Sequence, residues 1–313
     1  MFHLSILFYN VIIWIEKYIK RETNLFWLIF VLIILIISLV YFSMSGGRLW
    51  NQYLTDIKSS FTEIPISKNP QDIFSETCID KLPTLLKQHI INGKYLHSLL
   101  MDNMLIRFNN TKFRISAGKK PINIKFMQVN FAGRPDRHAF LRGKIFGIPM
   151  HAKDSVINGH GSMTVTLASL FQLFNVTGAE MDQSQLITAL ADAVYMPSLF
   201  LKNFVNYRIL DKHTIECEIT WNGISVKGKY TFDDNGNIIR FDTNDRYMDD
   251  NGKGSSRVPW YVNYSNYREQ NGFFQPGSVN VSWMLPDGDD TYFISDDIVI
   301  QYSINKDTII KFL

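Results

Sequence analysis

The sequence lacks the motifs that identify common enzymes and nucleic-acid-binding proteins. It contains no G-x-S-x-G nucleophile elbow, no complete glycine-rich phosphate loop, no internal repeat and no heptad pattern. Its 32 Lys and Arg residues nearly balance its 29 Asp and Glu residues, and no basic block occurs beyond the first 21 residues. Nucleic acid is therefore not expected as a partner, and no cofactor is predicted.

Cysteine is also scarce, with Cys78 and Cys217 as the only two. Cys217 lies on an alternating segment, Thr214–Trp221, which favours a buried thiol. The alternative is a Cys78–Cys217 disulfide, which an exported protein could form. No cysteine follows the apolar segment described next, so a lipoprotein anchor at that place is excluded.

One long apolar segment dominates the N-terminal region. Residues Leu25–Tyr41 contain no charge, and extended to Met44 the segment reaches the roughly 20 residues that a helix needs to cross a bilayer. Lys17, Lys20 and Arg21 precede it, so the positive-inside rule places its N-terminal side in the cytoplasm and the C-terminal part outside. The sequence therefore predicts a transmembrane anchor.

Two features near this segment leave open whether it is cleaved and whether a second segment spans the membrane. The small residues Ser43 and Ser45 resemble a signal-peptide cleavage site, although the apolar run is longer than a usual signal sequence. Residues Phe2–Ile15 form a shorter apolar stretch, which favours an interfacial segment, with a second span as the alternative. The predicted division of the chain is a cytoplasmic or interfacial segment (1–24), a transmembrane helix (25–44), a stalk (45–75) and an extracytoplasmic β-rich domain (76–313).

The C-terminal half favours β-hairpins. Asn222-Gly223 and Asn235-Gly236 each separate two alternating segments, and Asn-Gly is a strong hairpin signal because both turn positions favour φ > 0. Pro286-Asp287-Gly288 predicts a third turn. Alternating segments predict further strands both upstream, over residues 99–157, and downstream, where Thr308–Phe312 is expected to be the last strand.

Helices are fewer. Asp80–Ile91 carries its leucines on one stripe, and Gln183–Val194 has apolar residues at helical spacing with Asp182 as the expected N-cap. Leu167–Phe174 is read as a short helix or a strand end. The predicted class is α+β and β-dominated: a large, curved antiparallel sheet like a half-barrel, with a few packed helices, after the transmembrane helix.

Several short motifs, in order, resemble an uncharacterised bacterial family of membrane-anchored or exported domains of unknown function. They are Asp154 followed by Gly159-His160-Gly161, then Leu190-Ala191-Asp192 followed by Pro197, then Pro259-Trp260. The resemblance implies no established activity. Its layout of many antiparallel strands with few helices is similar to the half-barrel of periplasmic lipoprotein carriers, which is a likeness of fold alone.

Asp154, Asp192, Arg246 and Trp260 are the candidate site residues. A carboxylate on an apolar helix that packs over a sheet needs a partner. One interpretation is a pocket in which Asp192 and Asp154 meet Arg246 and the polar head of a ligand, with Trp260 on the apolar wall. The other interpretation is a structural ion pair that fixes the helix against the sheet.

His151 and His160 flank Asp154, but His151 and Asp154 point to opposite faces of an extended strand, so no metal site is predicted. Taken together, the sequence favours a non-catalytic module that binds an apolar or amphipathic ligand, such as a lipid, at the surface of the membrane that anchors it. The alternatives are an envelope hydrolase with an unrecognised site and a structural or interaction module. A deep apolar cavity would favour the first, and a converging His–Asp–Ser cluster the second.

Overall fold

The structure is a computed structural model that describes residues 17, 20, 25–38, 47–66, 69, 71–115, 118–249 and 255–312. Residues 25–38 of the apolar segment are helical, while 39–44 and the stretch Phe2–Ile15 lie outside the described residues. Within those ranges, no helix is long and apolar enough to cross a membrane. The predicted span and the alternative of cleavage near Ser43 both stay predictions.

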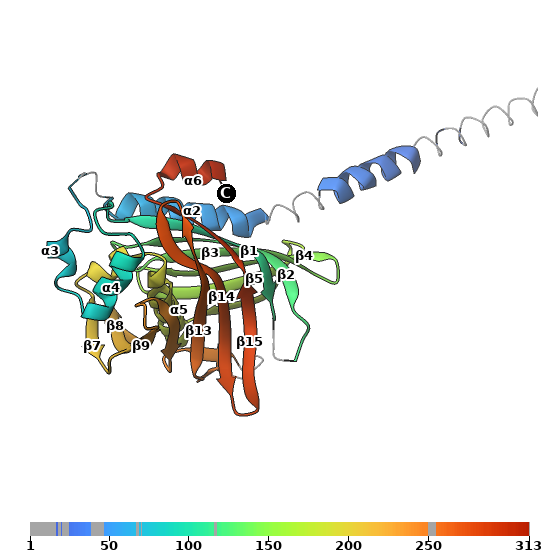
Figure 1. Cartoon of the computed structure of the whole chain (residues 1–313). Helices are drawn as coiled ribbons and strands as arrows, with labels where there is room; N and C mark the ends of the chain where they lie inside the picture. The colour runs from blue at the N-terminus through green and yellow to red at the C-terminus, as the bar shows by residue number, and fades with distance from the viewer. Residues whose placement is uncertain are drawn as a thin grey trace, which may run out of the picture.

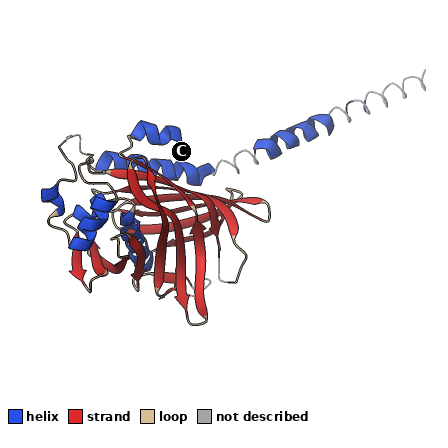
Figure 2. Cartoon of the chain, in the orientation of Figure 1, coloured by secondary structure: helices blue, strands red, loops and turns tan. Residues whose placement is uncertain are grey.

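One antiparallel sheet of 14 strands forms the body of the domain (Figure 2). The order of its main path is β6-β5-β4-β3-β2-β1-β15-β14-β13-β10-β9-β8-β7, and β16 pairs with β1 beside β15. The strands of the sheet are β1 (Asn103–Phe113), β2 (Ile122–Phe131), β3 (Arg137–Ile145), β4 (Ile148–Ile157), β5 (His160–Leu167), β6 (Phe171–Thr177), β7 (Val205–Ile209), β8 (Thr214–Trp221), β9 (Ile224–Phe232), β10 (Ile238–Thr243), β13 (Trp260–Gln270), β14 (Phe273–Leu285), β15 (Gly288–Ser295) and β16 (Asp297–Tyr302). A separate short hairpin is made of β11 (Tyr247–Asp249) and β12 (Ser255–Arg257).

Helices cover both faces of this curved sheet (Figure 1). They are α2 (Gly47–Glu63), α3 (Glu76–Ile79), α4 (Thr84–Asn92), α5 (Ala179–Ala191) and α6 (Lys306–Phe312), with 3-10 turns η1 (Asp192–Val194) and η2 (Pro197–Leu201). The β-dominated fold with a large, curved antiparallel sheet and a few helices, predicted from the hairpin turns and the alternation, is confirmed.

The first of the two Asn-Gly pairs forms the predicted two-residue hairpin turn, and the second lies in a longer loop. Asn222 and Gly223 have φ of 47° and 79°, so both central positions of the β8–β9 turn are left-handed, as the Asn-Gly pair predicts. In the β9–β10 loop only Gly236 is left-handed, with φ of 82°, because this connection is longer than two residues. Leu167–Phe174 is a hairpin, in which residues 168–170 join the end of β5 to the start of β6.

The sheet is curved enough for its two ends to approach each other. Helix α5 contacts β4, β5 and β6 at one end of the strand order and β8 and β9 at the other. The β4–β5 and β8–β9 turns also touch: Asn222 Nδ2 donates to the Asn158 backbone oxygen at 2.7 Å, and Trp221 Nε1 donates to Asn158 Oδ1 at 3.3 Å. Helix α5 therefore lies on the concave face of a nearly closed sheet.

The segment expected to be a stalk differs from that prediction. Residues 47–63 form α2, whose Leu49, Tyr53 and Ile57 recur every four residues on one face and are buried. They pack on the convex face of the sheet, where the Phe140 ring lies 5.3 Å from Tyr53. This segment is part of the domain because its apolar stripe matches that of β3.

Three further predictions are corrected. Residues 306–312 form helix α6 because Asn305 Oδ1 accepts from the Thr308 backbone N–H at 2.7 Å and caps the turn. Helix α5 begins after Gly178, and the carboxylate of Asp182 accepts from the Gly161 backbone N–H at 2.6 Å instead of capping the helix. Both cysteines are free thiols, so the disulfide alternative is wrong.

Candidate functional site

A cavity of about 960 Å³ lies between the concave face of the sheet and α5. Its walls are made mostly of apolar and aromatic side chains from β1 to β6 and from β13 to β15. Polar and charged side chains interrupt that wall, among them Gln128, Arg137, Asp154, Glu180, Gln185, Asp192, Arg246 and the ion pair of Arg114 with Asp290. Volumes of about 300 to 1,000 Å³ are typical of small-molecule sites.

The cavity is closed at one end and open at the other. Along β1, β2 and β3 the side chains are buried near Asn103, Phe131 and Arg137 and become half-buried or exposed toward the opposite ends of these strands. At that opposite end the lining residues Ile115 and Leu173 are 44% and 49% exposed. The open end therefore lies at the β1–β2, β3–β4 and β5–β6 hairpin tips.

All four residues predicted from the sequence line this cavity. Asp154 comes from β4, and Asp192 from η1 directly after α5. Arg246 follows β10, and Trp260 begins β13. As predicted from strand alternation, Asp154 and His151 lie on opposite faces of the sheet: Asp154 lines the cavity, and His151 stacks on Phe140 of the convex face.

The cation that meets both carboxylates is Arg137, at the closed end. Its Nη1 donates to Asp154 Oδ2 at 2.8 Å, and its Nε donates to Asp192 Oδ2 at 3.1 Å. The amides of Gln128 and Asn130 donate to the same Asp192 oxygen at 2.7 Å and 3.2 Å. This arrangement ties the C-terminal end of α5 to strands β2, β3 and β4.

Gln185 completes the network from the middle of α5. Its Nε2 donates to Asp154 Oδ1 at 2.5 Å, and its Oε1 accepts from Arg137 Nη1 at 3.1 Å. Each charged group therefore has both a counter-charge and hydrogen bonds, the condition under which a buried ion pair is tolerated. The network fits the interpretation of a structural ion pair.

The pKa shifts agree with a desolvated ion cluster. Burial raises the pKa of Asp192, and the Arg137 charge, with the Asn130 and Gln128 hydrogen bonds, only partly offsets this. For Arg137, burial acts to lower the pKa, but the two carboxylates outweigh it and the pKa is raised. Arg137 is thus cationic, and its charge favours the ionised form of Asp192.

Arg246 takes a different position from the one predicted. It donates through Nη1 to the Ser184 backbone oxygen at 2.7 Å and to Thr188 Oγ1, both on α5. Its guanidinium carbon lies 4.6 Å from the Trp260 ring centroid and 5.6 Å from that of Trp283. The expected meeting of Asp154 and Asp192 with Arg246 is corrected: Arg137 is nearer in the fold and takes both carboxylates.

Arg246 is left without a counter-charge in the part of the chain that the structure describes. No ion pair there includes it, and its Nε is buried without a hydrogen-bond partner. A guanidinium presents five N–H donors in a planar fork suited to carboxylates and phosphates. This cavity wall therefore offers a cation to an acidic group of a ligand.

Arg137, Gln185 and Gln128 were not among the site residues predicted from the sequence. Arg137 is the first residue of β3, where alternation places it on the same face as Ala139 and Leu141. Gln185 lies in the middle of α5 and is buried among the apolar residues of that helix. Polar residues on otherwise apolar faces were the available signal, since such groups need buried partners.

A Ser–His–Asp cluster lies on the other side of the sheet. Ser60 Oγ donates to Asp136 Oδ2 at 2.8 Å and lies 2.9 Å from His138 Nε2, and all three residues are buried. Because the Ser60 proton points to Asp136, His138 Nε2 donates to Oγ and cannot accept that proton. The Nδ1 atom of His138 has no partner, so no carboxylate orients the ring as in a catalytic triad. The cluster braces α2 against the sheet.

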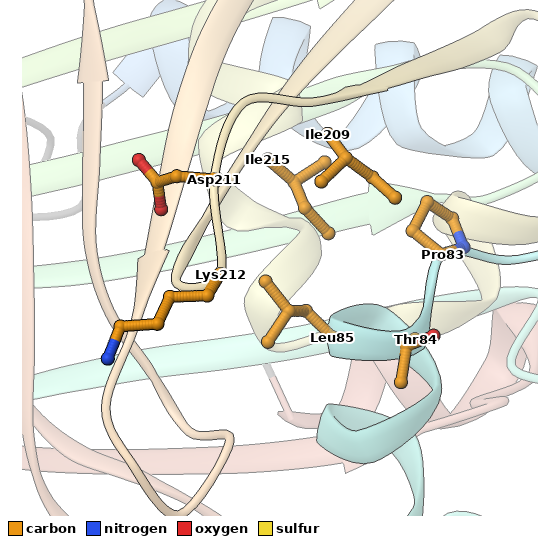
Figure 3. A pocket seen from close by; sticks show the side chains of 7 residues that line it. All are labelled: Pro83, Thr84, Leu85, Ile209, Asp211, Lys212 and Ile215. Atoms are coloured by element: carbon orange, nitrogen blue, oxygen red, sulfur yellow. The ribbon is translucent and has the colours of Figure 1, made fainter.

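Other places offer less chemistry. No group of three His, Cys, Asp or Glu side chains in the described ranges could hold a metal ion. A small hollow of about 200 Å³ lies between the start of α4 and the β7–β8 turn. In Figure 3 its Leu85, Ile209 and Ile215 side chains gather around one space, while Lys212 extends away from it. This hollow has no converging polar groups.

Comparison with known proteins places the chain in a family without giving an activity. The search of the curated proteins finds no match. Among solved structures, a LolA superfamily protein from Nitrosomonas europaea is similar, with 8% sequence identity, a TM-score of 0.39, and coverage of 74% of this chain and 98% of that one. A family model matches residues 72–295, which include all the predicted site residues and confirm the resemblance found in the motifs. The chain belongs to the family of unknown function DUF6544.

Proposed function

We propose that this protein is a membrane-anchored, extracytoplasmic module that binds an apolar or amphipathic ligand, such as a lipid, in the cavity between the sheet and α5, without catalysing a reaction. The single observation that carries the proposal is the cavity itself: about 960 Å³, walled mainly by apolar and aromatic side chains. Space of this size and lining is unfavourable when filled by water, because few wall atoms can hydrogen-bond it.

Two sets of polar groups in the wall have different roles in this proposal, and the Arg114–Asp290 pair forms a further one. The Arg137–Asp154–Asp192 network satisfies itself and closes one end, so in this proposal it shapes the site more than it contacts the ligand. Arg246 and Trp260 are the residues that meet the ligand, because the Arg246 guanidinium lacks an anionic partner among the described residues and lies against the Trp260 ring. An amphipathic ligand with an acidic head would pair that head with Arg246 and its apolar part with the aromatic wall.

The membrane part of the proposal depends on the sequence. Supporting it are the uncharged segment from Leu25 to Met44 and the basic residues that precede it. A reporter that is active only after export, fused after Leu313, is expected to be active. Activity of a cytoplasmic reporter alone would refute the orientation.

Ligand binding is tested with the full chain in mild detergent and two fluorescent probes, a fatty-acid analogue and its uncharged alcohol counterpart. Ala152 is buried on the cavity wall, so Ala152→Trp should fill the cavity and abolish binding of both probes. The matched control is Ile239→Trp at a partly exposed position of β10, which should bind like the parent. Binding that survives in a folded Ala152→Trp variant would refute the cavity as the site.

Arg246→Met separates the roles of charge and shape. Loss of a hydrogen bond to a charged group, worth about 1.5–3 kcal/mol, should weaken the fatty-acid probe by at least about tenfold. The alcohol probe should change little, which also controls for the contacts of Arg246 with α5. Equal weakening of both probes would assign Arg246 to the fold and not to the ligand.

A further inference from the structure

We propose that the three hairpin tips at the open end of the cavity dock on the surface of an anionic lipid bilayer, so that the cavity opens toward the membrane. The inference rests on the membrane anchor of the proposed function and goes beyond it by assigning the docking residues. It names one partner, the lipid surface, and follows from exposure, charge and the position at which the chain enters the domain.

Apolar side chains are exposed at these tips. We call the following set the tip surface: Ile115 of the β1–β2 connection, Phe146 and Ile148 at the β3–β4 turn, and Leu170 and Phe171 at the β5–β6 turn. Phe146 is fully exposed, and Phe171 and Leu170 are 66% and 51% exposed. The hairpins are neighbours, because β1 to β6 are consecutive in the sheet and Met150 pairs with Leu167 at this end. Large apolar groups gathered at adjacent tips mark an interaction surface.

Within the three connections themselves, the exposed charged side chains are lysines. Lys119, Lys120 and Lys144 are exposed beside the tip surface. Between residues 103 and 179 the only carboxylates are Asp136 and Asp154, and both lie toward the closed end of the cavity. Lysines flanking exposed aromatic and aliphatic side chains suit an anionic membrane interface, where the ammonium groups meet the lipid head groups.

The β14–β15 turn carries negative charge at the same end of the sheet. Asp287 and Asp289 lie there, and Asp290 of β15 is paired with Arg114 of the β1–β2 connection. In Figure 1 this hairpin and the β1–β2 connection beside it point down the page, whereas the β4 end of the sheet points to the right. The twist of the sheet therefore separates the acidic turn from the β3–β4 and β5–β6 tips, while the β1–β2 connection lies next to it.

The path of α2 places the tip surface near the anchor. Trp50, early in α2, lies under the Arg142 guanidinium at 4.2 Å, and Ser60, late in α2, contacts His138. Helix α2 thus runs antiparallel to β3, and its first residue, Gly47, points to the tip end. From Arg142 to Phe146 the strand extends about 13 Å, whereas from Trp50 back to Gly47 the helix extends only about 4.5 Å.

The reach of the chain then limits the distance to the membrane. Met44, the last residue of the apolar segment, is three residues before Gly47, a span of at most about 10 Å. If Met44 lies at the bilayer surface, the domain begins within that distance of it. The Phe146 tip, which extends beyond the start of α2, then meets the lipid.

Docking is tested by quenching in the full chain, reconstituted into bilayers that contain spin-labelled lipid. In a Cys78→Ser background, an environment-sensitive fluorophore is attached at Phe146→Cys or Phe171→Cys. Both labels should be quenched by the lipid. The control is Asp234→Cys in the β9–β10 turn, which lies against α4 at the opposite end of the domain and should not be quenched.

A label at Ser38→Cys separates failure of docking from failure of the anchor. If the label at residue 38 is quenched and the labels at 146 and 171 are not, docking is overturned and the anchor stands. If the label at residue 38 is not quenched, the anchor is overturned, and unquenched tip labels overturn docking in that case as well. Self-quenching of the tip labels that grows with protein density, without lipid quenching, would assign the surface to a second copy of the chain.

The charge argument has its own measurement. Replacing Lys119, Lys120 and Lys144 with Gln should weaken tip quenching severalfold in anionic bilayers and leave it unchanged in zwitterionic ones. Phe146→Ser combined with Phe171→Ser should slow uptake of the fatty-acid probe from anionic vesicles about tenfold while its affinity in detergent stays the same. Uptake as fast as that of the parent would refute the role of the tips in opening the cavity to the membrane.

Discussion

Arg137→Met should destabilise the protein more than any single change to the carboxylates it holds. The side chains of Arg137, Asp154 and Asp192 are only 5%, 13% and 16% exposed, so removing the cation leaves two buried carboxylates without a counter-charge. Breaking a buried pair in this way costs about 3–5 kcal/mol of the free energy of unfolding. Met keeps most of the Arg volume, so the loss reports charge and hydrogen bonds more than packing.

Asp192→Asn should cost less, about 1–2 kcal/mol. Arg137 keeps Asp154 as its partner at 2.8 Å, and the Asn carbonyl can still accept from Gln128 and Asn130. The change also removes the desolvation that raises the pKa of Asp192. The cost is below that of a fully broken pair because the structure shares one cation between two carboxylates.

The assay is a double-mutant cycle by denaturant unfolding of the full chain in detergent, followed by tryptophan fluorescence. The Arg137→Met/Asp192→Asn variant should be less destabilised than the sum of the single changes, by about 0.5–3 kcal/mol, because the second change removes one of the stranded charges. Strict additivity would refute the shared network. If Asp192→Asn left the stability unchanged but weakened ligand binding, Asp192 would belong to the site and not to the brace.

Three further outcomes are expected. Burial lowers the pKa of His89 to about 4 and that of His138 to about 3. Below the usual His pKa of about 6.5, the unfolded chain therefore binds protons that the folded chain does not, and the free energy of unfolding should decrease as the pH is lowered. Between pH 7 and pH 5 the parent should lose about 2 kcal/mol more stability than His89→Leu. Equal pH dependence of the two would contradict a neutral buried His89. A thiol reagent should label the half-buried Cys78 in the native chain, and should label the buried Cys217, whose pKa is raised by burial, only after unfolding. If the unfolded chain were labelled at neither cysteine before reduction and at both after it, the two would form a disulfide. Gly161→Ala should cost about 1–3 kcal/mol by thermal melting, because its new methyl carbon would lie 2.4 Å from the Met181 carbonyl oxygen and force α5 away from β5; an unchanged melting temperature would show that α5 is not held this closely.

The sequence determined the local features of this protein. Asn222-Gly223 specified its turn, because two adjacent left-handed positions strongly restrict the residue types that can occupy them. Alternation along β4 separated His151 from Asp154, and so placed Asp154 on the inner face. Apolar periodicity located α5 to within a few residues of its ends. These features depend on interactions between neighbours along the chain, which a single sequence displays.

Partner choice between distant segments was decided only by the tertiary structure. Asp192 was recognised as a carboxylate in need of a cation, but Arg137 and Arg246 were equally available in the sequence. The sheet curves so that β3 passes beneath the end of α5, and this brings Arg137 within 3.1 Å of Asp192 while Arg246 meets the middle of the helix. The same curvature created the cavity, at whose open end the β1–β2, β3–β4 and β5–β6 tips lie. Sheet curvature results from the summed twist of all the strands, and no single segment of the sequence encodes it.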